Sequence, residues 1–193
     1  MKNLKFSFLI AIFAIAIAGC NQSKNSNSDT EIGDSVSIFS IAKKAAIKIK
    51  VAEGTIMYYT HDSENQKLRM DIEDAIMLMD YKNKSMSVYS GMWIDIPWNP
   101  GAASEDYFDK MSEEGVTEQG YVKVGTMTVL DKVCDVYSVF NSDKNSEIKC
   151  AIWNGVTMWI EEDGKVIYEA LAVTLDVPEN FFEKTTMKHS WIE

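Results

Sequence analysis

Arginine is almost missing from this chain. Arg69 is the single arginine among 19 basic residues, and 29 acidic residues give the chain a formal net charge of −10. A protein that grips the phosphates of DNA or RNA needs a basic surface, and this composition is acidic. The sequence therefore excludes nucleic acid as a partner, and it excludes a phosphate site built from several arginines.

Histidine is nearly as scarce. His61 is expected in a turn and His189 in the tail, both at the surface, and no His/Cys pattern surrounds them, so we predict no metal site and no cofactor. No serine stands in a Gly-x-Ser-x-Gly elbow, and no glycine-rich phosphate loop follows a strand. The carboxylates of Asp71, Glu73 and Asp74 are typical of a solvated strand edge. We predict no catalytic residue and a protein that is not an enzyme.

The long apolar run that a membrane-spanning helix needs is missing too. Apolar residues extend only from Phe6 to Ala18, after two lysines, as in a cleaved signal peptide. The run ends in Ile-Ala-Gly followed by Cys20, and this stretch resembles the lipobox of bacterial lipoproteins. We therefore predict that residues 1–19 are a signal peptide, and that lipid on Cys20 anchors the chain to the membrane.

Residues 20–34 contain little that a folded core could bury, and their composition is typical of a flexible tether. Residues 35–193 have the length and apolar content of a single β-rich domain. No acidic run follows Cys20, so we expect an anchor in the outer membrane, with the domain facing the periplasm. Without residues 1–19 the chain keeps 17 basic and 29 acidic residues, a net charge of −12.

Alternating apolar and polar residues dominate the domain and predict nine to eleven strands joined by tight turns. Asp163-Gly164, between two such runs, is a strong signal for a two-residue hairpin. Two short helices are also predicted, over residues 36–46 and 104–114. Together these patterns predict a curved antiparallel meander whose few helices cover one face.

Two cysteines remain once Cys20 is assigned to lipid. Cys134 and Cys150 are an even pair in an oxidising compartment, and a turn cluster at 141–146 separates the two strand-like runs that contain them. A hairpin folded about Ser142 would set them opposite each other, at a Cβ separation that suits a disulfide. We predict a structural disulfide, with two buried thiols or a redox-active pair as the alternatives.

Several short motifs follow one another in a characteristic order along the domain. They are Gly-Thr-Ile-x-Tyr at 54–58, Arg69-x-Asp71, Tyr81-x-Asn83, Cys-x-x-Trp-x-Gly at 150–155, Glu169-Ala170 and Val177-Pro178. In this order the chain resembles the DUF4412-type envelope lipoproteins and, through them, the LolA/LolB superfamily of lipoprotein carriers. The resemblance implies an apolar cavity in a half-open barrel. The predicted fold class is therefore α+β, mostly antiparallel β: a strongly curved half-open barrel with one or two short helices covering the concave face.

Methionine and tryptophan supply many of the large apolar side chains, with 11 and 5 residues. Methionine adapts its shape to what it contacts, and small barrels can hold one apolar molecule. We therefore predict an apolar or acyl-chain ligand in the concave sheet, with an ordinary packed core as the alternative. The candidate ligand-binding residues are Arg69, Met57, Met70, Trp93, Trp98 and Trp153. Arg69 would meet a lipid carboxyl or phosphate there, or else pair with Asp71 or Glu73 at the surface.

A second hypothesis is a protein-interaction module of the cell envelope. The loop Gly91–Ala103 groups Trp93 and Trp98 with other apolar residues, and grouped exposed aromatic residues mark interfaces. An envelope protein partner would dock on this loop or on a sheet edge. The exposure of the two tryptophans decides between this hypothesis and a core role.

Overall fold

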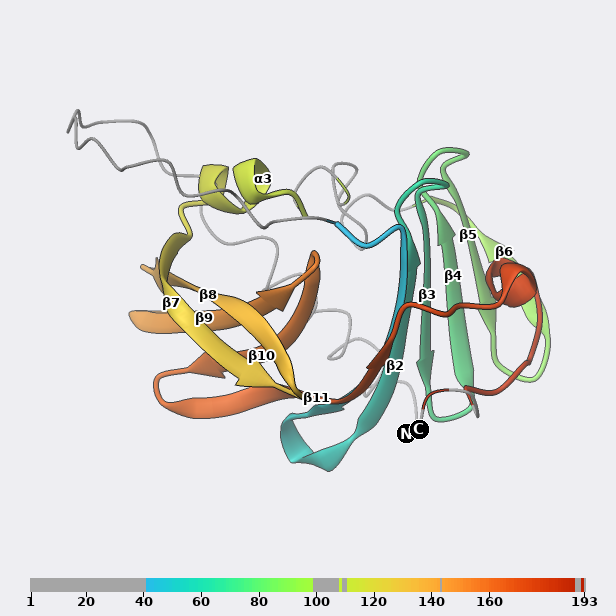
Figure 1. Cartoon of the computed structure of the whole chain (residues 1–193). Coiled ribbons are helices and arrows are strands. Elements are labelled where there is room, and N and C mark those ends of the chain that lie inside the picture. The colour runs from blue at the N-terminus through green and yellow to red at the C-terminus, as the bar shows by residue number, and fades with distance from the viewer. Residues whose placement is uncertain (1–40, 99–107, 109–110, 143, 190–191, 193) are drawn as a thin grey trace.

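The computed structural model describes residues 41–98, 108, 111–142, 144–189 and 192. Within these residues, eleven strands form one antiparallel sheet (Figure 1). The strands are β1 (Lys44–Val51), β2 (Ile56–Asp62), β3 (Lys67–Ile72), β4 (Ala75–Asp80), β5 (Ser85–Tyr89), β6 (Trp93–Ile96), β7 (Val122–Val129), β8 (Lys132–Asn141), β9 (Ser146–Trp153), β10 (Val156–Glu162) and β11 (Lys165–Thr174). Beside them lie the helix α3 (Glu113–Glu118) and the 3-10 turns η1 (Ala52–Gly54) and η2 (Glu179–Phe182).

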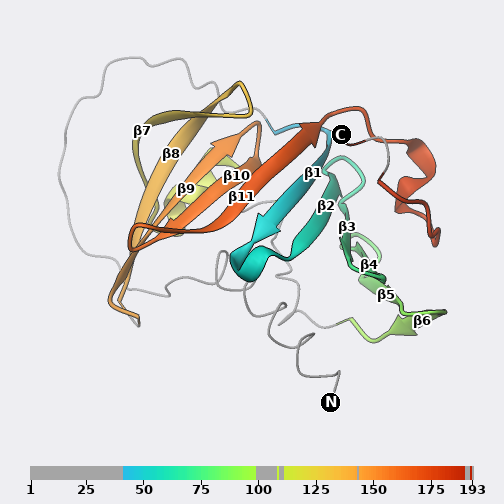
Figure 2. The same cartoon turned by 90° about the horizontal axis from the view of Figure 1, so that it is seen from below.

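The strand order is β6-β5-β4-β3-β2-β1-β11-β10-β9-β8-β7. Each half of the sheet is a meander of consecutive strands, and the pairing of β1 with β11 joins the two halves. Strands β6 and β7 are the two ends, so the sheet is open. Figure 2 shows that the sheet curves, with the C-terminal segment on its outer side. The main core, which includes Val116 of α3, lies on the inner side. We call the inner side the concave face and the outer side the convex face.

The two faces of strands β1–β6 differ sharply in polarity. Successive side chains of a strand point to opposite faces, and the cross-strand register shows which side chains share a face. Every charged side chain of these six strands falls on the convex face, and none falls on the concave face. Arg69, for example, is paired with Thr60, whereas the next residue, Met70, is paired with Tyr59 on the other face.

The predicted α+β class is wrong, because the described chain is nearly all antiparallel β with almost no helix. The helix expected over 36–46 gives way to β1 from Lys44 onwards, and residues 36–40 lie outside the described residues. Ala45 and Ala46 point to opposite faces, yet both are fully buried, because protein covers both faces of β1. Two consecutive apolar residues break the alternation expected of a strand and fit the spacing of apolar residues in a helix.

The second expected helix, over 104–114, lies mostly outside the described residues. The structure shows α3 instead, which begins after its N-cap Ser112, whose Oγ accepts a hydrogen bond from the backbone N–H of Gly115 at 3.0 Å. Gly115, the residue just after the expected helix, lies inside α3. A six-residue helix covers little of a sheet this wide, so the prediction that helices cover the concave face is not supported.

The predicted disulfide is absent, because Cys134 and Cys150, the two cysteines among the described residues, are both free and do not lie at disulfide distance. The register of the β8–β9 hairpin explains this result. It pairs Asn141 with Ser146 and sets Cys150 opposite Tyr137, three residues from the other cysteine. An odd offset turns the two side chains to opposite faces. Both cysteines are buried free thiols, as in the first alternative. Burial raises the pKa of the Cys150 thiol to about 12.

Candidate functional site

Three cross-strand rows of uncharged side chains make up the concave face of β1–β6. The rows are Ala45–His61–Leu68–Met79–Met86–Ile96, Ile47–Tyr59–Met70–Met77–Val88–Ile94 and Ile49–Met57–Ile72–Ala75. Four methionines stand next to one another where the first two rows cross β3, β4 and β5. Most side chains of these rows are buried and belong to the main core. The face is therefore continuous, apolar and rich in flexible side chains.

Described residues between β6 and β7 pack against the main core, in which Val116 of α3 is buried. Trp98, Phe108 and Met111 are partly buried against the same core. The rings of Trp98 and Phe108 both meet Tyr81 edge-on, at centroid distances of 5.1 and 5.3 Å. This cover is aromatic and lies where β4 passes into its turn with β5.

Two buried polar atoms in this region have no hydrogen-bond partner among the described residues, Nδ1 of His61 and Nε1 of Trp98. The His61 ring is fully buried, and its Nε2 lies 3.1 Å from the carbonyl oxygen of Ala42. Because a carbonyl oxygen can only accept, Nε2 carries the proton and Nδ1 presents a lone pair. Burial lowers the pKa of His61 to about 4, so the ring is neutral near neutral pH.

Arg69 lies on the convex face and is fully buried there. Its guanidinium donates to both carboxylate oxygens of Asp71, from Nε at 2.7 Å and from Nη2 at 2.8 Å. It also donates to the carbonyl oxygens of Phe181 and Met187, both at 3.0 Å, and lies 4.0 Å from the Phe181 ring centre. Arg69 thus fastens the C-terminal segment to the sheet. The expectation that it faces the concave side is wrong, and its pairing with Asp71 is buried instead of superficial.

His189 completes the contact between the C-terminal segment and the convex face. Its ring stacks on Tyr58 at a centroid distance of 4.2 Å and meets Phe181 edge-on at 4.6 Å. Its Nδ1 lies 3.5 Å from Oδ2 of Asp71, and its Nε2 lies 3.5 Å from Oγ1 of Thr60. Burial, followed by the nearby guanidinium charge, lowers the pKa of His189 to about 3, so this ring is also neutral near neutral pH.

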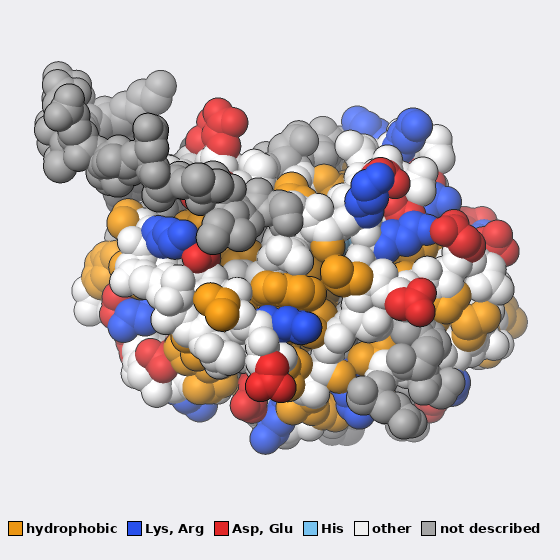
Figure 3. All heavy atoms as spheres, in the orientation of Figure 1, with side chains coloured by type: hydrophobic (Ala, Val, Ile, Leu, Met, Phe, Trp, Pro, Cys, Tyr) orange, Lys and Arg blue, Asp and Glu red, His pale blue; other side chains and the backbone are white. Residues whose placement is uncertain are grey.

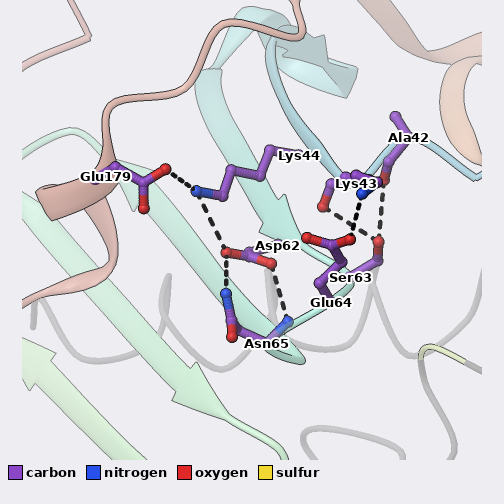
Figure 4. A network of polar contacts seen from close by, with 8 residues as sticks. All are labelled: Ala42, Lys43, Lys44, Asp62, Ser63, Glu64, Asn65 and Glu179. Atoms are coloured by element: carbon purple, nitrogen blue, oxygen red, sulfur yellow. Dashed lines mark hydrogen bonds and ion pairs between the residues drawn. The ribbon is translucent and has the colours of Figure 1, made fainter.

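A second set of polar contacts holds the C-terminal segment near the turn between β2 and β3 (Figure 4). The Lys44 ammonium group donates to Glu179 of η2 at 2.7 Å and lies 3.8 Å from Asp62. The Asp62 carboxylate accepts from the backbone and side-chain N–H groups of Asn65, at 3.0 and 2.8 Å. Glu179 is largely exposed, so its ion pair contributes little, whereas the contacts of Asp62 shape the turn.

A cleft of about 960 Å³ lies between the C-terminal segment and the convex face. One cross-strand row lines its floor, in the order Lys48, Tyr58, Asp71, Ile76 and Tyr89 from β1 to β5. Charged side chains from the β3–β4 turn and from the C-terminal segment add to this lining, namely Glu73, Asp74 and Lys188. The lining mixes acidic, basic and aromatic groups, so the cleft suits a polar molecule better than an acyl chain.

The candidate ligand-binding residues do not converge on one site. Met57 and Met70 lie on the concave face, and Trp98 packs at its end. Trp93 lies instead in the convex row, with its ring 5.4 Å from that of Tyr89. Trp153 ends β9, in the other half of the sheet, where the Lys132 ammonium group lies 5.2 Å from its ring. Three of the six predicted ligand-binding residues therefore lie on the concave face or at its end.

Sequence reasoning missed the role of His61. The strand β2 extends through Asp62, so His61 is a buried strand residue and the predicted turn begins later. Alternation along β2 was the available signal, because His61 follows Met57 and Tyr59 at the same spacing. The expectation of a surface position is wrong for His189 as well, which is buried against the convex face.

The side of the molecule drawn in Figure 3 shows no block of a single charge. On the side drawn in Figure 3, acidic and basic side chains are interspersed with exposed hydrophobic ones. Among the described residues, no cluster of His, Cys, Asp and Glu is placed to hold a metal ion, and no helix has the length and apolarity to cross a bilayer. No protein-family model and no curated protein matches this chain. The resemblance to the LolA/LolB superfamily therefore stays a prediction.

Proposed function

We propose that this protein is a lipid-anchored, non-enzymatic component of the bacterial cell envelope that binds an apolar or acyl-chain ligand on its concave face. One observation carries the proposal. The concave face of β1–β6 is uncharged and rich in methionine, and two buried polar atoms near it lack partners among the described residues. A face that served only as a core would gain nothing from buried polar atoms that are left unsatisfied.

The shape of the concave face favours a chain-like ligand. Two of its rows cross six strands, and strands spaced about 4.8 Å apart make the face about 24 Å across. The neighbouring methionines Met70, Met77, Met79 and Met86 are unbranched, so they can rearrange around a chain without leaving voids. The convex cleft is a weaker candidate for such a ligand, because its charged groups would lose water when an acyl chain entered.

Native mass spectrometry of residues 31–193, purified gently from the periplasm, tests the ligand. We expect a reproducible added mass that is lost in denaturing spectra. Met77→Trp should fill the concave face and lower the occupancy, whereas Ile76→Trp, at the adjacent position on the convex face, should leave it unchanged. A bare protein mass, together with no uptake of a fluorescent fatty acid, would contradict the proposal.

The membrane anchor rests on Cys20 and the residues before it, which lie outside the described residues. Each buried methylene of an acyl chain adds about 0.8 kcal/mol, so more than one chain makes anchoring stable. The intact mass of the expressed full chain should show loss of residues 1–19 and gain of acyl groups, and Cys20→Ser should abolish both changes. A full chain that keeps residues 1–19 and carries no acyl group would contradict the anchor.

A second candidate function is the docking of an envelope protein at the β6 end of the sheet. Met92 and Ile94 leave 66% and 53% of their surfaces exposed there, whereas Trp93 packs on Tyr89. Residues 99–103 of the predicted docking loop lie outside the described residues. Serine at Met92 and Ile94 should weaken cross-linking to an envelope partner without changing the urea midpoint. A lowered urea midpoint would instead place these two side chains in the core.

A further inference from the structure

The two unpartnered polar atoms lie toward the same end of the concave face. Strands β2, β4 and β6 run in the same direction, because each is separated from the next by one antiparallel strand. His61 is near the end of β2, Tyr81 follows β4, and Trp98 follows β6. His61 and Met79 belong to one row, about 10 Å apart across two strand spacings, and Trp98 packs on Tyr81 just beyond that row.

The unpartnered atoms have opposite hydrogen-bonding characters. Nδ1 of His61 is an acceptor, because Nε2 donates to Ala42, and Nε1 of Trp98 is a donor only. A hydroxyl group can donate to the first atom and accept from the second. A fully ionised carboxylate or phosphate monoester has no hydrogen to donate, so it cannot form a hydrogen bond with Nδ1 of His61. An ammonium group has no lone pair to accept with, so it cannot form a hydrogen bond with Nε1 of Trp98.

The surroundings also disfavour an anionic head group. No charged side chain of β1–β6 falls on the concave face, so a buried anion there would find no cation on these strands. The single arginine is fully buried on the other face, where the Asp71 carboxylate and two carbonyl oxygens already occupy it. The concave face can therefore bind a head group only through hydrogen bonds between neutral groups, at one end of a long apolar surface.

We infer that the ligand of the concave face is a neutral amphiphile whose hydroxyl-bearing head group binds His61 and Trp98 while its chain lies along the methionine rows. A monoacylglycerol has this chemistry, because it joins one acyl chain to two hydroxyl groups. The inference rests on the proposed function and narrows it to one ligand class. It assigns the binding of the head group to two residues and excludes acidic lipids as preferred ligands.

A competition experiment with two matched lipids tests the inference. The full chain in phosphatidylcholine nanodiscs is labelled with a monopalmitoylglycerol that carries a photoreactive group in its chain. Unlabelled monopalmitoylglycerol and its phosphate ester then compete for labelling. We expect the neutral lipid to compete at a concentration about tenfold lower or more, because the site offers hydrogen bonds but no cation.

Substitutions at the two head-group residues complete the test. Trp98→Phe and His61→Phe should each remove most of the preference, whereas His61→Asn keeps an acceptor near the position of Nδ1 and should retain it. Trp93→Phe, on the convex face, is the control and should change nothing. Labelling without a preference, or a preference for the phosphate ester, would overturn the inference and leave the proposed function standing. Absence of saturable labelling by either lipid would overturn both.

Discussion

Replacement of Arg69 by methionine should loosen the C-terminal segment from the sheet. Methionine fills much of the same volume but cannot donate to Asp71 or to the carbonyl oxygens of Phe181 and Met187. These acceptors are wholly or partly buried, so they would lose hydrogen bonds without gaining full access to water. The Asp71 carboxylate, with a side chain only 13% exposed, would keep its charge without the guanidinium group beside it.

The expected loss in the free energy of unfolding at pH 7 is about 3–5 kcal/mol, the usual effect of removing one partner of a buried ion pair. Such a loss is a large part of the stability of a domain, which is about 5–15 kcal/mol. Lys67→Met is a matched control on the same strand and face, and we expect it to cost less than about 1 kcal/mol.

The loss caused by Arg69→Met should shrink at acid pH. Burial raises the pKa of Asp71 above its ordinary value, and Arg69 opposes that rise. Without Arg69 the pKa rises further, so the folded variant binds a proton more tightly than the unfolded chain does. A raised carboxyl pKa contributes stability at low pH that is lost as the pH rises through the folded-state value. The deficit relative to wild type is therefore larger at pH 7 than at pH 4.5.

Urea unfolding followed by circular dichroism at both pH values measures these differences. Limited trypsin digestion adds a local readout, because Lys184 and Lys188 lie in the segment that Arg69 holds. The variant should be cleaved faster at these two sites. A deficit below about 1 kcal/mol at pH 7, or an equal deficit at both pH values, would refute the role given to the guanidinium group.

Three further predictions concern other parts of the chain. Both Cys134 and Cys150 should react with iodoacetamide only after unfolding, because they are buried free thiols, and a disulfide mass deficit would contradict this. Acid should destabilise the domain by about 3 kcal/mol through His61, because the unfolded imidazole binds a proton below pH 6.5 and the folded one only below about 4. His189 adds acid sensitivity of the same sign, so urea midpoints of His61→Phe should fall less steeply with acid than those of the wild type. Gly155→Ala should cost about 1 kcal/mol more than Gly164→Ala in urea unfolding. Both positions have positive φ, but an added Cβ meets Ile41 at 3.2 Å only at Gly155, so equal losses would count against the predicted clash.

Local signals along the chain predicted its strands well. Asp163 and Gly164 both adopt positive φ in the turn between β10 and β11, as the two-residue hairpin signal requires. Most other strands follow from alternation, because one face of each is apolar. The failures occur where both faces are buried. Ala45 and Ala46 suggested a helix because the convex face of β1 is also covered by the C-terminal segment.

Long-range contacts could not be predicted from single segments. The pairing of β1 with β11 joins residues more than a hundred positions apart, and no local pattern specifies it. The burial of Arg69 depends on Phe181 and Met187, which approach only in the folded chain. The prediction that Cys134 and Cys150 pair failed for a different reason. The turn between β8 and β9 is centred slightly later along the chain than Ser142, and this shift changes every cross-strand pair of the hairpin.

Mapping where a photoreactive acyl chain attaches to the full chain shows whether the concave face is the ligand site. A palmitoyl probe is cross-linked to the protein in nanodiscs, and the labelled residues are located by peptide mass spectrometry. We expect adducts on the concave face, at Met70, Met77, Met79 and Met86. Adducts confined to Tyr58 and Tyr89 in the convex cleft, or labelling that unlabelled lipid does not reduce, would contradict it.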